Sequence, residues 1–302
     1  MAKDTPWRLL MAAALALMIT ACDKTTDSAN PSSSAAHDIG TAIDDKFAAF
    51  IRAANSESSM TYHSLPEAFY HYQRDVAPFI ATGKTLERYS VVNPAMLHTL
   101  SDGLAKALSM PGALPPLDNA AQQYKASLDK LIPLSEALYD YAQNKTWLSD
   151  SGDLARRSHP DYIAGFDAIL MQRDRFLRAI SIANHERIKL AWEQSPENSP
   201  AHFRYGVVWL SRQTLEELND PSLSASLNKD AATLHQLSAG WQQLLQQQGN
   251  GQCQSIFHAL DTYLSALDEA MQAQAQGRET ADDKTILPFN ALVSALSNNR
   301  QC

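Results

Sequence analysis

Two clusters of polar side chains have residue types and spacings that could support chemistry. In the first, His63, Glu67 and His71 recur every four residues, so a continuous helix would align two imidazoles and a carboxylate on one face. Nitrogen and oxygen ligands of this kind suit zinc. Ser64 and Pro66, however, are typical of a helix start and would leave His63 before the helix. A solvated helix start is the simpler interpretation, and we assign no metal site here.

The second cluster is the most polar in the chain and follows a turn. It comprises Asp150, Asp153, Arg156, Arg157 and His159. Arginines are bidentate donors, so such a cluster could bind an anion or a carbohydrate. Tyr139, Tyr141 and Trp147 lie shortly before it and could stack on a sugar, although their spacing also suits packing between helices. Turn residues followed by a charged helix face explain the same pattern more simply.

The common catalytic and zinc signatures are missing from the sequence. It contains no G-x-S-x-G elbow, no H-E-x-x-H sequence and no pair of C-x-x-C sequences. We therefore predict no catalytic residue and no cofactor. Because triads are assembled in space, an envelope hydrolase with a cleft near Tyr141 to His159 stays open as an alternative. A metal or small-ligand carrier that uses the region from His63 to His71 is a further one.

The elements that must position these residues are helices. The chain has 36 Leu but only 6 Val, and this shortage of β-branched residues disfavours an extensive sheet. Apolar residues recur at helical spacing through most of the chain. Breaks occur at residues 110–117, 149–152, 195–200 and 249–251, where proline, glycine and small polar residues gather. The sequence predicts an all-α, antiparallel bundle of about seven to nine helices.

The N-terminus has the pattern of an export signal. Lys3 and Arg8 precede a short apolar run that is too short to span a bilayer, and residues 19–22 resemble a bacterial lipobox with Cys22 as its acylated cysteine. We predict a signal peptide at 1–21, a flexible tether at 22–40 and a helical domain at 41–302. Acyl chains on Cys22 would attach the protein to a membrane. Asp23 directly follows Cys22 and resembles an inner-membrane retention signal of bacterial lipoproteins. This resemblance favours the periplasmic face of the inner membrane over the outer membrane.

Charge and cysteine content indicate which kinds of partner and which cellular compartment to expect. The net charge of −8 argues against a basic surface that binds nucleic acid. Lipidation of Cys22 leaves Cys253 and Cys302 as a possible disulfide in an oxidising compartment. If the last helix packs antiparallel to the helix that begins near Cys253, the two cysteines meet. A buried Cys253 with a disordered tail is the alternative.

Short motifs in this chain resemble a family of lipoproteins. Matching positions are Leu131-Ile132-Pro133-Leu134, Tyr139, Tyr141, Lys145, Asp150, Ala168, Phe176 and the segment Phe289-Asn290-Ala291-Leu292-Val293. In these residues the chain resembles the YiiG-like family of uncharacterised bacterial lipoproteins. The resemblance implies a helical, exported lipoprotein and supplies no catalytic residues. Together with the anchor and the tether, it favours a non-enzymatic binding or interaction module in the cell envelope.

Overall fold

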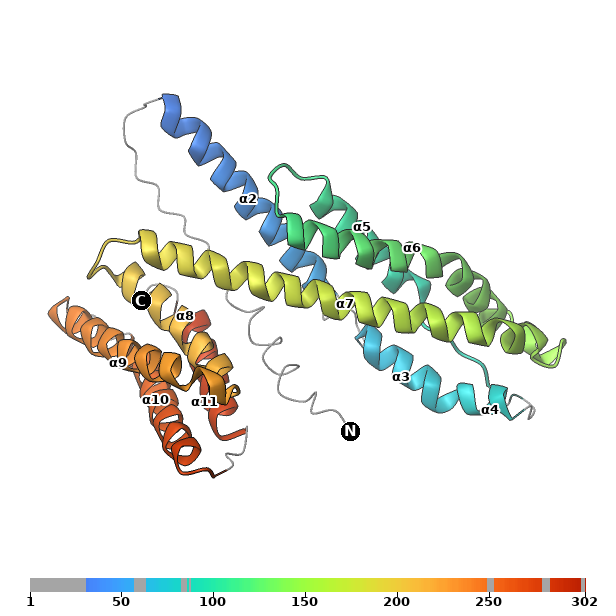
Figure 1. The fold of residues 1–302 in the computed structure, drawn as a ribbon. Helices are drawn as coiled ribbons and strands as arrows, with labels where there is room; N and C mark the ends of the chain where they lie inside the picture. The colour runs from blue at the N-terminus through green and yellow to red at the C-terminus, as the bar shows by residue number, and fades with distance from the viewer. Residues whose placement is uncertain are drawn as a thin grey trace. The chain divides into compact units, whose positions relative to one another are not determined.

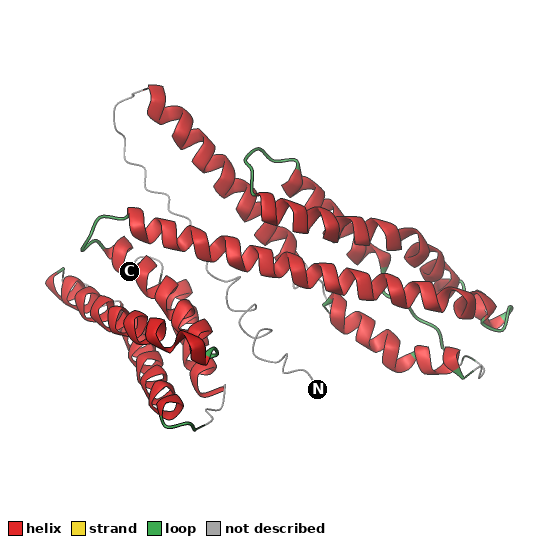
Figure 2. Ribbon diagram, viewed as in Figure 1, coloured by secondary structure: helices red, strands yellow, loops and turns green. Residues whose placement is uncertain are grey.

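The computed structural model describes residues 31–56, 64–82, 86, 88–248, 253–278, 283–299 and 302. The predicted signal peptide, Cys22 and His63 lie outside these residues. The regular structure of the described chain is helical, without a strand (Figure 2), which confirms the predicted all-α fold. None of the helices in the described ranges is long and apolar enough to cross a membrane.

Short connections join most of the consecutive helices (Figure 1). The helices are α2 (Pro31–Ser56), α3 (Leu65–Asp75), α4 (Ala77–Ala81), α5 (Pro94–Leu108), α6 (Pro115–Gln143), α7 (Asp153–Gln194), α8 (Pro200–Leu218), α9 (Ser224–Gln247), α10 (Gln254–Ala275) and α11 (Asp283–Asn298). Helix α2 begins inside the segment 22–40 that we predicted as a tether. The described chain divides into two compact units, an N-terminal unit that ends at Ile180 and a C-terminal unit from Ser181 to Cys302.

The N-terminal unit is built on α5, which packs against both α2 and α6. Asn93 starts α5, because its side chain accepts a hydrogen bond of 3.0 Å from the backbone N–H of Ala95. Helix α7 lies close to α6 at Gly165, where a Cβ atom would come within 2.5 Å of Leu131 Cδ1. Helix α2 contacts α7 through Phe50, whose ring lies edge-on to that of Phe176 with 6.0 Å between the ring centroids. Apolar faces of four helices thus share one core.

A buried lysine connects α2 to the start of α6. The Lys46 side chain is buried, and its Nζ donates to the carbonyl of Gly112 at 2.9 Å and pairs with Asp118 Oδ1 at 2.9 Å. Gly112 has a φ of +94°, which favours glycine, and it lies against Ile43 of α2. The ion pair therefore holds the 109–114 connection against α2.

In the C-terminal unit, α8 and α9 approach each other through two glycines. A Cβ atom on Gly206 of α8 would lie 2.6 Å from Leu237 Cδ1, and one on Gly240 of α9 would lie 2.7 Å from Phe203 Cε1. On each helix, a side chain of the neighbouring helix therefore packs directly against the backbone at the glycine. Leu237, Phe203 and Trp241 belong to the continuous apolar core of this unit, which also includes residues of α10 and α11.

A disulfide and an arginine fix the end of α11. Cys253 and Cys302 are bonded, with a distance of 5.8 Å between their Cα atoms, as the antiparallel packing of α10 and α11 predicted. The guanidinium group of Arg204 on α8 donates to the carbonyls of Leu296 and Asn299. These are carbonyls at a helix C-terminus that have no partner within the helix, so a cation there is favourable.

Candidate functional site

The predicted polar cluster begins with Asp150, which closes a turn. Its Oδ1 accepts hydrogen bonds from the Tyr141 hydroxyl at 2.6 Å and the Gly152 N–H at 2.9 Å, and its Oδ2 accepts one from the Leu154 N–H at 3.2 Å. The Tyr141 hydrogen bond, assisted by these backbone donors, lowers the pKa of the Asp150 carboxyl. Asp150 therefore acts like a helix cap at the start of α7. Its carboxylate oxygens accept hydrogen bonds from groups in or beside the same turn.

The arginines of the cluster are engaged close to their own positions. Arg156 donates to the carbonyl of Ser151 in the same turn. Arg157 pairs with Asp153 one helical turn away at 2.9 Å, and both side chains are exposed. The structure therefore brings Asp150 and Arg156 to one turn but places Arg157 and Asp153 on the surface of α7. Such an exposed pair contributes little to stability.

His159 belongs to an aromatic layer that our sequence interpretation missed. Its Nδ1 lies 2.8 Å from the Tyr72 hydroxyl, and the Tyr162 hydroxyl accepts a hydrogen bond of 3.0 Å from the Val92 N–H. Burial lowers the pKa of His159 and raises the pKa values of Tyr72 and Tyr162. His159 is therefore neutral near pH 7 and suited to accept from Tyr72, while both phenols keep their protons. This layer packs α3 against α7.

Of the weak metal candidates, Glu67 and His71 lie on α3 within the described residues. His71 Nδ1 lies 4.0 Å from Asp75 Oδ2, which is one turn further along α3. Glu67 lies on the exposed side of α3. Over the described ranges, His, Cys, Asp and Glu side chains form no group of three that could hold a metal ion.

A pocket in the C-terminal unit is the better candidate site. Three helices line it, and we call it the α7–α8–α11 pocket. Its lining residues are Asn184, His185, Ile188, Val208, Ser211, Arg212, Phe289, Leu292, Val293 and Leu296. Its volume is about 470 Å³ when the space open to solvent is included. Between its walls there is room for about one water molecule.

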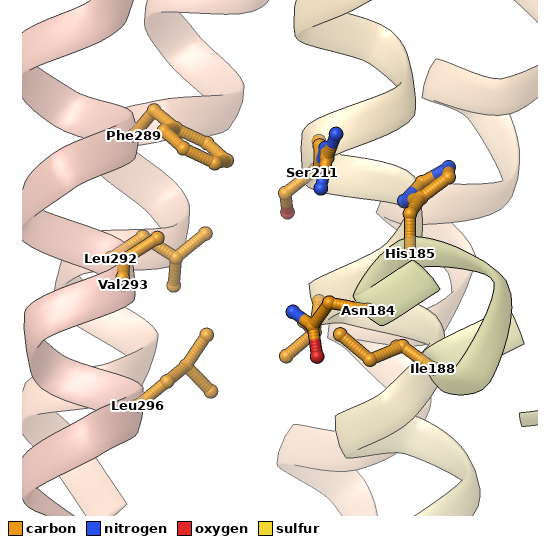
Figure 3. A pocket seen from close by; sticks show the side chains of 10 residues that line it. Asn184, His185, Ile188, Ser211, Phe289, Leu292, Val293 and Leu296 are labelled. Carbon is orange, nitrogen blue, oxygen red and sulfur yellow. The ribbon is translucent and has the colours of Figure 1, made fainter. Parts of the chain in front are cut away.

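The two walls of the pocket differ in chemistry. Figure 3 shows the α11 side chains Phe289, Leu292, Val293 and Leu296 on one side, and Asn184, Ile188 and Ser211 facing them across the gap. The Ser211 hydroxyl and the Asn184 amide point towards the apolar wall, and His185 lies farther from it. The site thus combines an aliphatic surface with a few convergent polar groups, which is typical of small-molecule sites.

The polar wall carries hydrogen-bonding groups without partners. Ser211 is 1% exposed and Asn184 is 8% exposed. In the described part of the chain, the Ser211 hydroxyl is buried without a hydrogen-bond partner, and the Asn184 amide makes no hydrogen bond. The buried Ser211 hydroxyl costs about 1–3 kcal/mol when it is left unsatisfied. The pocket therefore favours a guest that supplies hydrogen bonds to these two side chains.

The charged side chain at the pocket is already compensated. Arg212 donates from Nε to Glu216 Oε1 at 2.8 Å and from Nη1 to the Ser181 carbonyl at 2.8 Å. Burial, followed by the positive charge of Arg212, lowers the pKa of His185. Its Nε2 lies 3.2 Å from Gln213 Oε1, so a neutral ring donates there and presents Nδ1 as an acceptor. Around neutral pH the polar wall is therefore nearly uncharged.

Sequence analysis did not identify this pocket, because its residues lie in three distant segments. Each segment has the apolar spacing of an ordinary core helix, and this spacing does not show which faces meet. The available signal was weak. Asn184 and His185 interrupt the apolar run of α7, and Ser211 and Arg212 interrupt that of α8.

Comparisons with known proteins give a family and no activity. No curated protein and no solved structure matches the chain. A family model described as "Protein of unknown function (DUF3829)" matches residues 41–294. This match covers most of the chain, including every helix from α3 to α10, so the chain belongs to that family of unknown function.

Proposed function

We propose that this protein is a membrane-tethered lipoprotein of the bacterial cell envelope that binds a small ligand without transforming it. The observation that carries the binding role is the α7–α8–α11 pocket, in which Asn184 and Ser211 face an apolar wall. The export signal, the lipobox ending in Cys22 and the resemblance to YiiG-like lipoproteins support the tether. The anchor lies in the inner membrane with the domain in the periplasm, since Asp23 follows Cys22.

The alternative hydrolase near Tyr141 to His159 finds no specific support. Asp150 is held by three local hydrogen bonds, and neutral His159 is bonded to a phenol whose raised pKa makes it a poor nucleophile near pH 7. A general base must reach the proton that it abstracts, and both groups are engaged with tyrosine hydroxyls.

Binding is tested by equilibrium dialysis against a small-molecule extract of bacterial envelopes, followed by mass analysis of the retained compounds. The wild-type chain should enrich at least one compound over the variant Val293→Phe, which places a larger side chain in the pocket. Leu287→Ala is the matched control, because Leu287 is also on α11 but is exposed. Equal enrichment by wild type and Val293→Phe would rule out the pocket as the binding site.

The tether is tested separately by metabolic labelling with a fatty acid that carries a clickable group. Wild type should be labelled and fractionate with the inner membrane, whereas Cys22→Ser should lose both the label and the membrane association. An unlabelled wild-type protein would contradict lipidation, and a labelled protein in the outer membrane would contradict the predicted location.

A further inference from the structure

The pocket chemistry specifies the class of ligand. We propose that the α7–α8–α11 pocket binds a small neutral amphiphile, in which a short alkyl chain or ring carries an amide or hydroxyl head group. This inference rests on the binding role proposed above and adds the chemical identity of the guest. It follows from three observations on the pocket, which concern its polar wall, its charges and its apolar wall.

The polar wall favours a ligand head group that can both donate and accept hydrogen bonds. The Ser211 hydroxyl and the Asn184 amide each contain a donor and an acceptor, and both lack partners among the described residues. A carboxylate could satisfy only the donors, and an ammonium group only the acceptors. An amide or a hydroxyl satisfies both kinds of group at once, so a neutral head fits the wall best.

The charges around the pocket also favour a neutral head group. The Arg212 guanidinium pairs with the Glu216 carboxylate and donates to the carbonyl of Ser181. A charged head would lose its hydration on entry without gaining a free counter-ion, and such a loss is costly in a buried site. The arginine therefore does not select an anion here.

The apolar wall accepts the remainder of the ligand. Phe289, Leu292, Val293 and Leu296 form one face of α11, and each is at most 5% exposed. The pocket has room for about one water molecule, and the head group would take that place. The alkyl chain of the ligand would pack against this face of α11.

The class is tested by calorimetric titration of the full-length, oxidised chain with hexanamide, hexanoate and hexylammonium. These probes share one alkyl chain and differ in the charge of the head. Hexanamide should bind with a Kd of about 1 mM, as expected for so small a ligand. Hexanoate and hexylammonium should bind at least about tenfold more weakly, because their charges find no compensation.

Variants locate the probe in the pocket. Ser211→Ala should weaken hexanamide about fivefold through the loss of one hydrogen bond. Val293→Phe should abolish binding of all three probes, and Leu287→Ala should leave binding unchanged. Circular dichroism checks that each variant is folded. Asn184→Leu, which removes the amide at similar size, gives the same readout if Val293→Phe does not fold.

The outcomes separate the ligand class from the binding role. If a charged probe binds as tightly as hexanamide and Val293→Phe abolishes its binding, the pocket is a binding site but the neutral class is wrong. If no probe binds, or if Val293→Phe binds hexanamide as wild type does, both the class and the pocket are wrong. The proposal stands only if the neutral probe is preferred and is lost on substitution in the pocket.

Discussion

At the scale of single residues, buried hydroxyls hold helices together through backbone carbonyls. The hydroxyl of Tyr263 on α10 donates to the carbonyl of Ser211 on α8 at 2.7 Å and lies 2.9 Å from Thr214 Oγ1. The Tyr263 side chain is completely buried, and this burial raises the pKa of its phenol. The hydrogen bond therefore persists across the ordinary pH range and fixes the backbone beneath the polar wall of the pocket.

The substitution Tyr263→Phe should lower the free energy of unfolding by about 1–3 kcal/mol, because it leaves buried polar groups without a partner. Urea unfolding at neutral pH measures this change. Tyr70→Phe is the matched control, since Tyr70 is exposed, and it should change stability by less than about 0.5 kcal/mol. Equal effects of the two variants would show that the Tyr263 hydrogen bond contributes nothing.

His185 makes stability depend on pH. Burial and Arg212 lower its pKa in the folded state below the ordinary value of 6.5, so the unfolded chain binds more protons between these two pKa values. The stabilisation is complete above pH 6.5 and is lost as the pH falls towards the lower folded pKa. One such group gives a slope of at most about 1.4 kcal/mol per pH unit.

His185→Gln should reduce this loss of stability at acid pH, because glutamine has no proton to take up. Urea unfolding at several pH values between 5 and 7.5 measures the slopes. His159 has a pKa lowered by burial as well, so part of the pH dependence should remain in the variant. His235→Gln, at an exposed position, serves as the control, and an unchanged slope in His185→Gln would contradict the assignment.

Long-range partners of single residues could not be predicted from the sequence. Tyr72 and His159 are separated by 87 positions, and Lys46 and Gly112 by 66. Helical spacing identifies the apolar face of each helix but does not tell which polar side chains at its margin will meet. The residues predicted as one polar cluster, from Asp150 to His159, are divided in the structure between a turn, the exposed surface of α7 and an aromatic layer.

At the scale of elements, local signals predicted helix starts and stops well. The Asn93-Pro94 pair begins α5, and the break predicted at 195–200 falls between the end of α7 and the start of α8. Asp118 lies inside the first turns of α6, and its Oδ2 accepts a hydrogen bond of 3.0 Å from the Leu114 N–H. Because Pro115 and Pro116 favour the first positions of a helix, α6 begins earlier than its acidic residue.

Turns between helices depend on glycines with positive φ. Gly152 has a φ of +79° and Gly277 one of +66°, but a Cβ on Gly152 would lie 2.6 Å from Leu86 Cδ1, whereas one on Gly277 would have nothing within 4 Å. Gly277→Ala should therefore cost about 1–2 kcal/mol for the backbone conformation alone. Gly152→Ala should cost more. Thermal unfolding of both variants measures the difference, and equal costs would mean that Leu86 moves aside freely.

At the scale of the whole molecule, the C-terminal unit has the properties of an independently folding part. Its apolar core is continuous from Ile188 to Cys302, and its disulfide joins residues 49 positions apart. A bridge over such a loop stabilises by about 4 kcal/mol in the chain-entropy account. The sequence predicted this bridge from antiparallel packing, but it did not predict the division at Ile180, because α7 runs through that point without a break.

The fragment Ser181–Cys302 should fold by itself when oxidised. Its circular dichroism should be helical, and its urea unfolding should be a single cooperative transition. Cys253→Ser in the same fragment should lower the free energy of unfolding by about 4 kcal/mol or prevent folding. A fragment that stays unfolded with the disulfide formed would show that this unit depends on the rest of the chain.

The paired glycines of α8 and α9 have a consequence for sequence variation. Leu237 and Trp192 fill the space left by Gly206, and Phe203 fills the space left by Gly240, so each glycine shares a fixed volume with Leu237 or Phe203 of the neighbouring helix. Among homologues, a larger residue at position 206 should occur together with a smaller one at 237, and likewise for positions 240 and 203. An alignment of the family can therefore reveal this helix crossing as two pairs of coevolving positions.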